Sequence, residues 1–286
     1  MCGIGAYIGD KDASSILTSI IRDLEYRGYD SCGIATYSDG KINCKKDIGK
    51  VSDIDFSSLK GNVGIAHTRW ATHGIVNFEN SHPHSDCDKK MYLVHNGIIE
   101  NADELRNILA GHEFTSKTDS EVIIHLIEDF VNAGDTVEDA FVKCLKLLEG
   151  AYAIVLIHEE KLYVARKGSP LVLGVGNNEM FVASDSVPIQ KYTRNIIFLE
   201  EGDYGVLWKD NYKINNLDSV DVDREIKILN NNIDEISKGS FEHFMLKEIY
   251  EQPKTIERAF LGRISDDKVK FGGLNISEDV LKKIKR

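Results

Sequence analysis

The chain has 286 residues, 42% of them hydrophobic and 28% charged, which is typical of one large globular domain or of one domain with an appendage. Its net charge of -11 argues against a nucleic-acid partner, because binding a phosphate backbone needs concentrated Lys and Arg. No apolar run approaches the ~20 residues of a membrane span, and the N-terminus lacks a signal-peptide pattern, so no membrane partner is expected. The cysteines are scattered without CxxC spacing, which suits neither a disulfide framework nor a zinc site and predicts a cytoplasmic protein with reduced thiols: Cys2, Cys32, Cys44, Cys87 and Cys144.

The first third of the chain alternates strand and helix signals. Residues 2–8 predict a short buried strand, and residues 11–25 place apolar side chains at helical spacing. Strand-like runs flank Asp39-Gly40, a pair suited to a type I′ turn, and predict a β-hairpin. Further strands are expected at 62–67 and 91–95, and the long polar loop between them has a length more often functional than idle.

Helices and then strands dominate the next part of the chain. Between residues 151 and 215, repeated short strand-like runs are broken by Gly, Asn and Asp. Strand runs beside helix runs, joined by tight hairpins, predict an α+β domain of mainly antiparallel sheet. Helices are expected near 101–110, 118–132 and 136–148.

The chain changes character from about residue 217, where it becomes polar and charge-rich and predicts an edge strand followed by a connector. The stretch "FEHFMLKEIYEQP" predicts a helix that stops at Pro253. This tail has too few apolar residues to form a core of its own. We therefore divide the chain into a domain over 1–240 and a linker over 241–286.

The opening "MCGIG" places Cys2 directly behind the initiator methionine. Removal of Met1 would leave a thiol and a free α-amine on one carbon. The amine, with a reference pKa near ~8, can act as a base, and the thiol is the best side-chain nucleophile. Alternatively, the second residue is simply small, as methionine removal favours. The pattern alone does not decide between the two.

The octet "HTRWATHG", residues 67–74, gathers a fixed cation, an indole, a hydroxyl and an imidazole at the end of a predicted strand. Arg69 is suited to holding a carboxylate through paired hydrogen bonds, and Trp70 to covering a pocket and excluding water. A surface ion pair for Arg69 and a core position for Trp70 explain the same residues equally well.

The stretch "LVHNGIIEN", residues 93–101, predicts an apolar strand that ends at Asn96-Gly97. There a side-chain amide and an unhindered backbone N–H lie side by side, which is what a developing oxyanion needs. An ordinary Asn-Gly turn remains an alternative, since such turns are common.

The stretch "KTDSEVI" predicts the start of a helix, with Thr118 or Asp119 as its N-cap. A functional alternative has Asp119 point its carboxylate at a ligand ammonium, opposite Arg69. Taken alone, the capping interpretation is preferred.

The stretch "SHPHSDC" invites a metal interpretation through His82, His84 and Cys87. No second group of ligands stands at zinc-like spacing, and Pro83 stiffens the loop. No metal site is therefore expected.

Together these motifs match a known family. The stretches "CGIGAYIG", "LEYRGYDSCGIA", "GIAHTRWATHG", "NSHPH", "VHNGIIEN" and "TDSEVI" occur in the order found in class II glutamine amidotransferases, which the chain resembles over nearly its whole length. The resemblance implies an N-terminal-nucleophile amidohydrolase fold, a four-layer αββα sandwich of mainly antiparallel sheets. The variants "RGYDS", "HTRWATHG" and "FEHFMLKEIYEQP" are most similar to the branch of the family that transfers nitrogen from glutamine to fructose 6-phosphate.

The resemblance also implies a role for each site residue. Cys2, freed of Met1, would attack the side-chain amide of L-glutamine, its own α-amine serving as base, and the resulting thioester would be hydrolysed to glutamate. Asn96 and Gly97 would hold the oxyanion. Neither a cofactor nor a metal is implied. The substrate-binding residues would be those that hold the α-carboxylate (Arg69), hold the α-ammonium (Asp119), close over glutamine (Thr72 and His73) and keep ammonia away from water (Trp70).

The chain departs from the family pattern in small ways and in length. Cys32 stands where the family usually has Ala, and the proline common after "HTRWATHG" is missing, but neither change touches the expected chemistry. The resemblance implies that the sugar isomerase domain, which binds fructose 6-phosphate, is absent from this chain and that the full enzyme is a homodimer. Two alternatives remain: the glutaminase half of another class II amidotransferase, which "RGYDS" argues against, and a catalytically silent regulatory module, which the intact site residues argue against.

Overall fold

The computed structural model describes residues 2–71, 74–229 and 240–261, together with the short stretches 264–265, 268–269, 280 and 283. The chain divides into two compact units, 1–233 and 234–286. None of the helices in the described residues combines the length and the apolar character that crossing a bilayer requires. The assignment of 241–286 as a linker stays a prediction.

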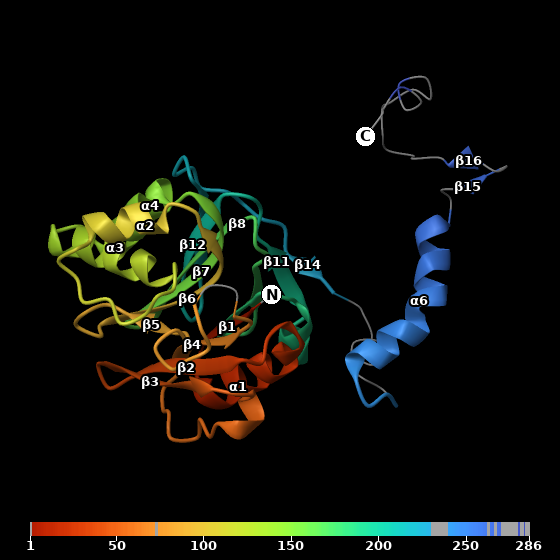
Figure 1. Ribbon diagram of the computed structural model, residues 1–286, viewed down its shortest axis with the longest axis horizontal. Coiled ribbons are helices and arrows are strands. Elements are labelled where there is room, and N and C mark those ends of the chain that lie inside the picture. The colour runs from red at the N-terminus through yellow and green to blue at the C-terminus, as the bar shows by residue number, and fades with distance from the viewer. Residues whose placement is uncertain are drawn as a thin grey trace. The chain divides into compact units, whose positions relative to one another are not determined.

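The larger sheet of the first unit has eight strands, and all its pairings are antiparallel (Figure 1). The six residues of its strand β1 are all buried, as predicted for 2–8. Strands β2 and β3 form the predicted hairpin, which turns at Asp39 and Gly40 with φ values of 51° and 76°, as a type I′ turn requires. In spatial order the strands are β14 (Lys227–Ile228), β11 (Asn195–Phe198), β9 (Val172–Val175), β10 (Met180–Ala183), β1 (Gly3–Ile8), β4 (Val63–Arg69), β2 (Ser31–Ser38) and β3 (Lys41–Ile48).

The second sheet has six antiparallel strands. Its strand β6 runs on to Ile99, so the prediction that this strand ends at Asn96-Gly97 is wrong. Gly97 stays paired with Tyr152 at a φ of 145°, which glycine adopts without strain, and a Cβ there would overlap the carbonyl oxygen of Ala151. In spatial order the strands are β13 (Tyr212–Asn216), β12 (Asp203–Leu207), β8 (Lys161–Lys167), β7 (Gly150–His158), β6 (Met91–Ile99) and β5 (His84–Ser85).

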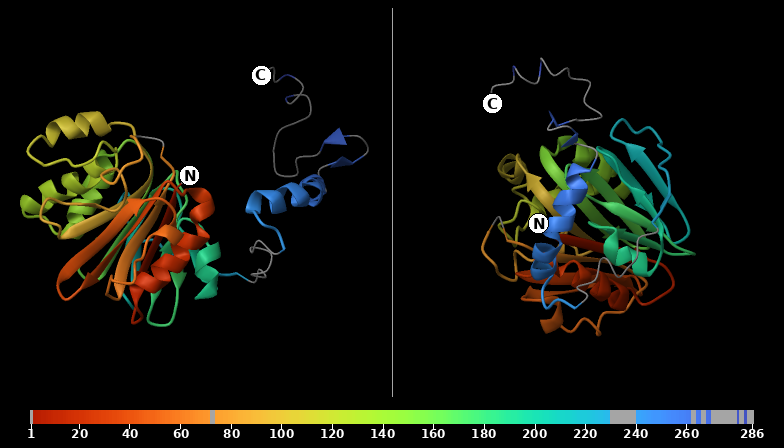
Figure 2. Two further views of the ribbon diagram at one scale, coloured as in Figure 1. Left: turned by 60° about the horizontal axis from the view of Figure 1, so that its bottom comes forward. Right: turned by 90° about the vertical axis from the view of Figure 1, so that its right-hand side faces the viewer.

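Helices cover the outer face of each sheet, which gives the first unit four layers (Figure 2). Side chains alternate along β1: Ile4 and Ile8 join the apolar cluster between the two sheets, whereas Tyr7 joins the cluster under α1. A third cluster packs α2, α3 and α4 onto the six-stranded sheet. The predicted α+β class and αββα sandwich are therefore confirmed. The helices are α1 (Ala13–Asp23), α2 (Ala102–Ile108), α3 (Glu121–Asn132) and α4 (Val137–Leu147), with 3-10 turns η1 (Glu25–Arg27), η2 (Val51–Asp53) and η3 (Val187–Lys191).

The second unit contains helix α6 and a short antiparallel pair of strands. The helix continues through Pro253, so the predicted stop there is wrong. Proline removes one backbone donor, but most described side chains of α6 are exposed, so water can hydrogen bond the carbonyl that this leaves unpaired. The elements are α6 (Phe244–Phe260), β15 (Ile264–Ser265) and β16 (Lys268–Val269).

Candidate active site

Cys2 lies immediately before β1, where β1 begins and the antiparallel β4 ends. The register pairs Gly3 with Thr68, which brings Cys2 beside the end of β4. The Trp70 backbone N–H donates to Cys2 Sγ at 3.2 Å, and Arg27 Nε donates to the Cys2 carbonyl oxygen at 3.0 Å. The fold thus places the candidate nucleophile against the motif "HTRWATHG".

The surroundings of the Cys2 thiol make a base necessary. Burial raises the pKa of this thiol, although the Trp70 N–H and the positive charges of Arg69 and Arg27 act in the opposite direction. A thiol with a raised pKa is mostly protonated at neutral pH, and the thiolate is the reactive form. Within the described part of the chain, Sγ is hydrogen bonded by the Trp70 backbone and by no side chain.

The Asn96 side chain bridges the two sheets at this point. Its Nδ2 donates to the Cys2 carbonyl oxygen at 3.0 Å, and its Oδ1 accepts from His67 Nε2 at 2.9 Å. His67 Nε2 also lies 3.2 Å from the His95 carbonyl oxygen, so two acceptors place the ring hydrogen on Nε2. Burial lowers the pKa of His67 to about 3, which keeps the ring neutral. His67 therefore orients the Asn96 amide, a role that the sequence analysis missed although this histidine opens the octet.

Arg69 is not the surface ion pair that the sequence left open, because it is only 4% exposed at the end of β4. Its guanidinium donates from Nη1 to the Ile75 carbonyl oxygen at 3.3 Å and from Nη2 to the Gly74 carbonyl oxygen at 3.5 Å. Burial lowers the pKa of Arg69, and the negative charges of Asp30 and Asp119, with that of Cys2 when it is ionised, partly offset this. A buried cation therefore lies near both the candidate nucleophile and the candidate ammonium ligand.

Neither Thr118 nor Asp119 caps α3, so the capping interpretation of "KTDSEVI" is wrong. The N-cap position is Ser120, whose side chain makes no capping bond. Asp119 Oδ2 instead accepts from the Ile99 N–H at 2.8 Å, because the carboxylate reaches the end of β6 and satisfies a backbone donor there. Asp119 is thereby held on the strand that carries Asn96.

Asn80 is a buried link that the sequence analysis missed. Its Nδ2 donates to the Ile75 carbonyl oxygen and its Oδ1 accepts from the Lys117 N–H, both at 2.9 Å. It joins the segment held by Arg69 to the segment that ends at Asp119. The only sign of this role in the sequence is that Asn80 lies in the long polar loop between residues 67 and 91, which is expected to be functional.

Of the three remaining predicted residues in the octet, the structure describes Trp70 but not Thr72 or His73. Trp70 is 45% exposed and packs edge-on against Tyr29 at a ring distance of 5.8 Å, so a core position for Trp70 is excluded. Thr72 and His73 lie outside the described residues, and their role in closing over a ligand stays a prediction.

His82 and His84 belong to a buried stack of imidazoles and are separated from Cys87. The His82 ring lies 4.2 Å from the His67 ring and 4.5 Å from the His84 ring, centroid to centroid. Burial lowers the pKa of both His82 and His84 well below the usual value, so the stack is neutral. These two histidines pack behind the Asn96–His67 pair.

The sequence matches the model of a family described as a glutamine amidotransferase domain over residues 67–191. The glutamine–fructose-6-phosphate aminotransferase (isomerizing) of Pyrococcus horikoshii is 48% identical over 276 residues, which cover 93% of this chain and 46% of that protein. The chain carries a class II glutamine amidotransferase domain. The enzyme of the same name from Thermotoga maritima is 43% identical over all of this chain and 48% of its own length, so the chain spans about half the length of these curated relatives.

Solved structures agree with the assignment of the amidotransferase domain. A glutamine phosphoribosylpyrophosphate amidotransferase from B. subtilis, complexed with ADP and GMP, matches with a TM-score of 0.68 and 28% identity. The match covers 76% of this chain and 49% of that chain. A glutamine aminotransferase class-II domain protein from Silicibacter pomeroyi matches 76% of this chain and 99% of its own with a TM-score of 0.54, and at 16% identity it shows the shared fold alone.

Proposed function

We propose that this domain hydrolyses the side-chain amide of L-glutamine to glutamate and ammonia, with Cys2 as the nucleophile once Met1 has been removed. The observation that carries the proposal is the convergence of the Cys2 thiol, the Asn96 amide and the buried Arg69 where β1 and β4 meet. Free glutamine carries an α-carboxylate and an α-ammonium, and Arg69 and Asp119 offer the matching charges. Thr72 and His73 close over the bound substrate, and Trp70 keeps ammonia away from water.

The chemistry follows from the donors around the thiol. The α-amine of Cys2 takes the thiol proton, Sγ adds to the amide carbon, and the proton then leaves with ammonia. Water hydrolyses the resulting γ-glutamyl thioester, which releases glutamate and restores the thiol. Asn96 Nδ2 carries two hydrogens and uses one on the Cys2 carbonyl oxygen, so the other can donate to the oxyanion together with the Gly97 N–H.

We further propose that the ammonia aminates fructose 6-phosphate, as the ammonia-supplying half of glucosamine 6-phosphate synthesis. The sugar would bind a sugar isomerase domain that these residues do not include, in a cytoplasmic homodimer. The support is sequence similarity: the relatives named for fructose 6-phosphate are 41% to 48% identical, against 28% for the phosphoribosylpyrophosphate enzyme. Neither a cofactor nor a metal takes part in the proposed hydrolysis.

The test measures glutamate and ammonia release and intact mass on the same preparation. Protein that begins at Cys2 should release both products in equal amounts, Cys2→Ala should release neither, and Cys44→Ala, a change at a thiol on β3, should be unaffected. Adding fructose 6-phosphate should neither stimulate the reaction nor yield an amino sugar. Full-rate hydrolysis by folded protein with a non-removable residue before Cys2 would overturn the proposed mechanism.

A further inference from the structure

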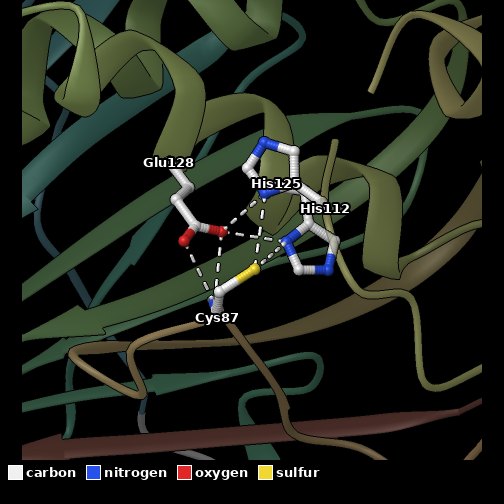
Figure 3. Close-up of side chains that lie close together, drawn as sticks. All are labelled: Cys87, His112, His125 and Glu128. Atoms are coloured by element: carbon white, nitrogen blue, oxygen red, sulfur yellow. Dashed lines mark hydrogen bonds and ion pairs between the residues drawn. The ribbon is translucent and has the colours of Figure 1, made fainter. Parts of the chain in front are cut away.

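A second group of chemistry-bearing side chains lies beside α3, apart from the candidate active site: Cys87, His112, His125 and Glu128 (Figure 3). Cys87 lies in the turn between β5 and β6, and His112 in the segment between α2 and α3, whereas His125 and Glu128 are three residues apart on α3 itself. One ligand atom from each of the four lies within 4.8 Å of every other. Three segments of the chain therefore converge on a single point.

The spacing of these atoms suits a tetrahedral metal site. Cys87 Sγ lies 3.5 Å from His112 Nδ1 and 3.8 Å from His125 Nδ1. Glu128 Oε2 lies 3.1 Å from His112 Nδ1 and 2.9 Å from His125 Nδ1. Around a tetrahedral zinc ion with Zn–S near ~2.3 Å and Zn–N or Zn–O near ~2.0–2.1 Å, ligand atoms stand roughly 3.3–3.6 Å apart. These four separations lie within a few tenths of an ångström of that range, and the remaining pairs lie within 4.8 Å.

The far nitrogen of His112 is hydrogen bonded to a carboxylate, with Nε2 lying 2.7 Å from Asp129 Oδ1. Metal-bound histidines almost always direct the second ring nitrogen to such a partner, which places the hydrogen there and leaves the first nitrogen bare for the metal. His125 Nε2 lies 3.8 Å from Glu121 Oε1, an ion-pair contact that is too long for a hydrogen bond. Here both Nδ1 atoms point to the centre of the group, as Figure 3 shows.

We propose that Cys87, His112, His125 and Glu128 bind one structural zinc ion. A thiolate and two imidazoles favour zinc over magnesium or calcium, and four protein ligands without an open position indicate a structural site. On binding, the Cys87 thiol releases its proton to solvent, and the thiolate and the carboxylate offset the charge of the ion. The ion ties the β5–β6 turn and the α2–α3 segment to α3.

The proposed site departs from the expectation that the chain holds no metal site. In the sequence, the candidate histidine ligands nearest to Cys87 are His82 and His84, and no second set of ligands stands at zinc-like spacing. The proposed partners, His112 and His125, are 25 and 38 residues away from Cys87. Cys87 meets the two histidines because the turn between β5 and β6 packs against α3, and not because the three residues are close together in the sequence.

The experiment measures zinc content and thermal unfolding of the untagged chain after dialysis. The parent chain should retain one zinc ion per chain. Cys2→Ala, which removes a different thiol, should retain it too, and in both proteins added zinc should raise Tm. Asp129→Asn should weaken zinc binding about 10–100-fold, and Cys87→Ser or His112→Asn more than that.

Cobalt substitution gives a second measurement that does not depend on stability. The parent chain and Cys2→Ala loaded with Co²⁺ should show a thiolate charge-transfer band, and Cys87→Ser should lack it. Cys87 is exposed, so Cys87→Ser should fold, and the half-buried His112 gives a second, independent variant in His112→Asn. Zinc content at background in the parent chain, or an unchanged cobalt band in Cys87→Ser, would overturn the proposal.

Discussion

The substitution His67→Phe tests whether a buried imidazole sets the orientation of the Asn96 amide. Phenylalanine keeps a flat ring against His82, whose ring lies 4.2 Å away, but removes the donor at Nε2. Asn96 Oδ1 and the His95 carbonyl oxygen, now 2.9 Å and 3.2 Å from that nitrogen, would both lose it. The amide would then be free to turn its NH₂ group away from the reacting carbonyl.

The expected magnitude follows from the loss of one buried donor. Leaving a buried acceptor unsatisfied costs about 1–3 kcal/mol, and each ~1.4 kcal/mol in a barrier is tenfold in rate. Full removal of an oxyanion donor costs about 10²–10³ in kcat, which bounds the effect from above. We expect kcat to fall about 10–100-fold and KM for glutamine to stay nearly unchanged, because the oxyanion exists only in the transition state.

The assay is steady-state glutamine hydrolysis by four variants of the chain that begins at Cys2. His82→Phe is the matched control, since His82 lies in the same stack and its ring nitrogens make no hydrogen bond within the described residues; its kcat should stay near that of the parent. Asn96→Ala should cost more than His67→Phe, and the double variant no more than Asn96→Ala alone. Additive losses in the double variant, or an equal loss in His82→Phe, would refute the reasoning.

Three further predictions follow from the same geometry. Arg69→Ala should weaken glutamine binding at least tenfold, since a lost charge-assisted hydrogen bond costs ~1.5–3 kcal/mol, and should affect far less a γ-amide that lacks the α-carboxylate; equal losses would count against the assignment. Gly97→Ala should lower the free energy of unfolding in urea by at least about 1–3 kcal/mol, because its φ of 145° is strained for alanine and the Cβ overlaps Ala151, whereas Gly111→Ala, in open space, should be neutral. Because the folded-state pKa of His67 is lowered to about 3, the stability it contributes is present above about pH 6.5 and is lost as pH falls toward 3; His67→Phe should flatten the dependence of the free energy of unfolding on pH by up to about 1.4 kcal/mol per unit in that range.

The layers of the fold could be predicted because each element carries its own signal. The continuous run of small and apolar residues in β1 and the apolar spacing of α1 are local patterns that packing reinforces. The predicted ends of β6 and α6 are wrong because the surroundings compensate for a residue that usually interrupts backbone hydrogen bonding. Gly97 keeps β6 paired through an Asn-Gly step, and Pro253 lies in an exposed helix where water can take the lost bond. Such compensation depends on the surroundings and leaves no periodicity in the sequence.

The site residues named by motif could be predicted, but the residues that hold them could not. Cys2 and Asn96 were chosen for their chemistry, and the structure joins them through a hydrogen bond. His67 and Asn80 act on other protein groups, so neither offers a reactive side chain that would draw attention to it. Their roles appear only once the fold brings distant partners into contact: His67 meets Asn96, 29 residues away, across the two sheets, and Asn80 meets Lys117, 37 residues away, between two loops.

Side chains hold the segment between α2 and α3 along its length. This explains why the residues of "KTDSEVI" that were predicted to cap α3 make other contacts instead. Glu121, in the first turn of α3, accepts hydrogen bonds from the backbone N–H groups of Thr115 and Ser116 at 2.9 Å and 2.7 Å. The Glu121 carboxylate therefore binds the preceding segment, while the Asp119 carboxylate accepts a hydrogen bond from the Ile99 N–H of β6. The same helix carries His125 one turn later, in the proposed zinc site. One helix thus fixes both ends of the segment, and the proposed ammonium ligand is positioned by contacts that a helix-capping motif does not contain.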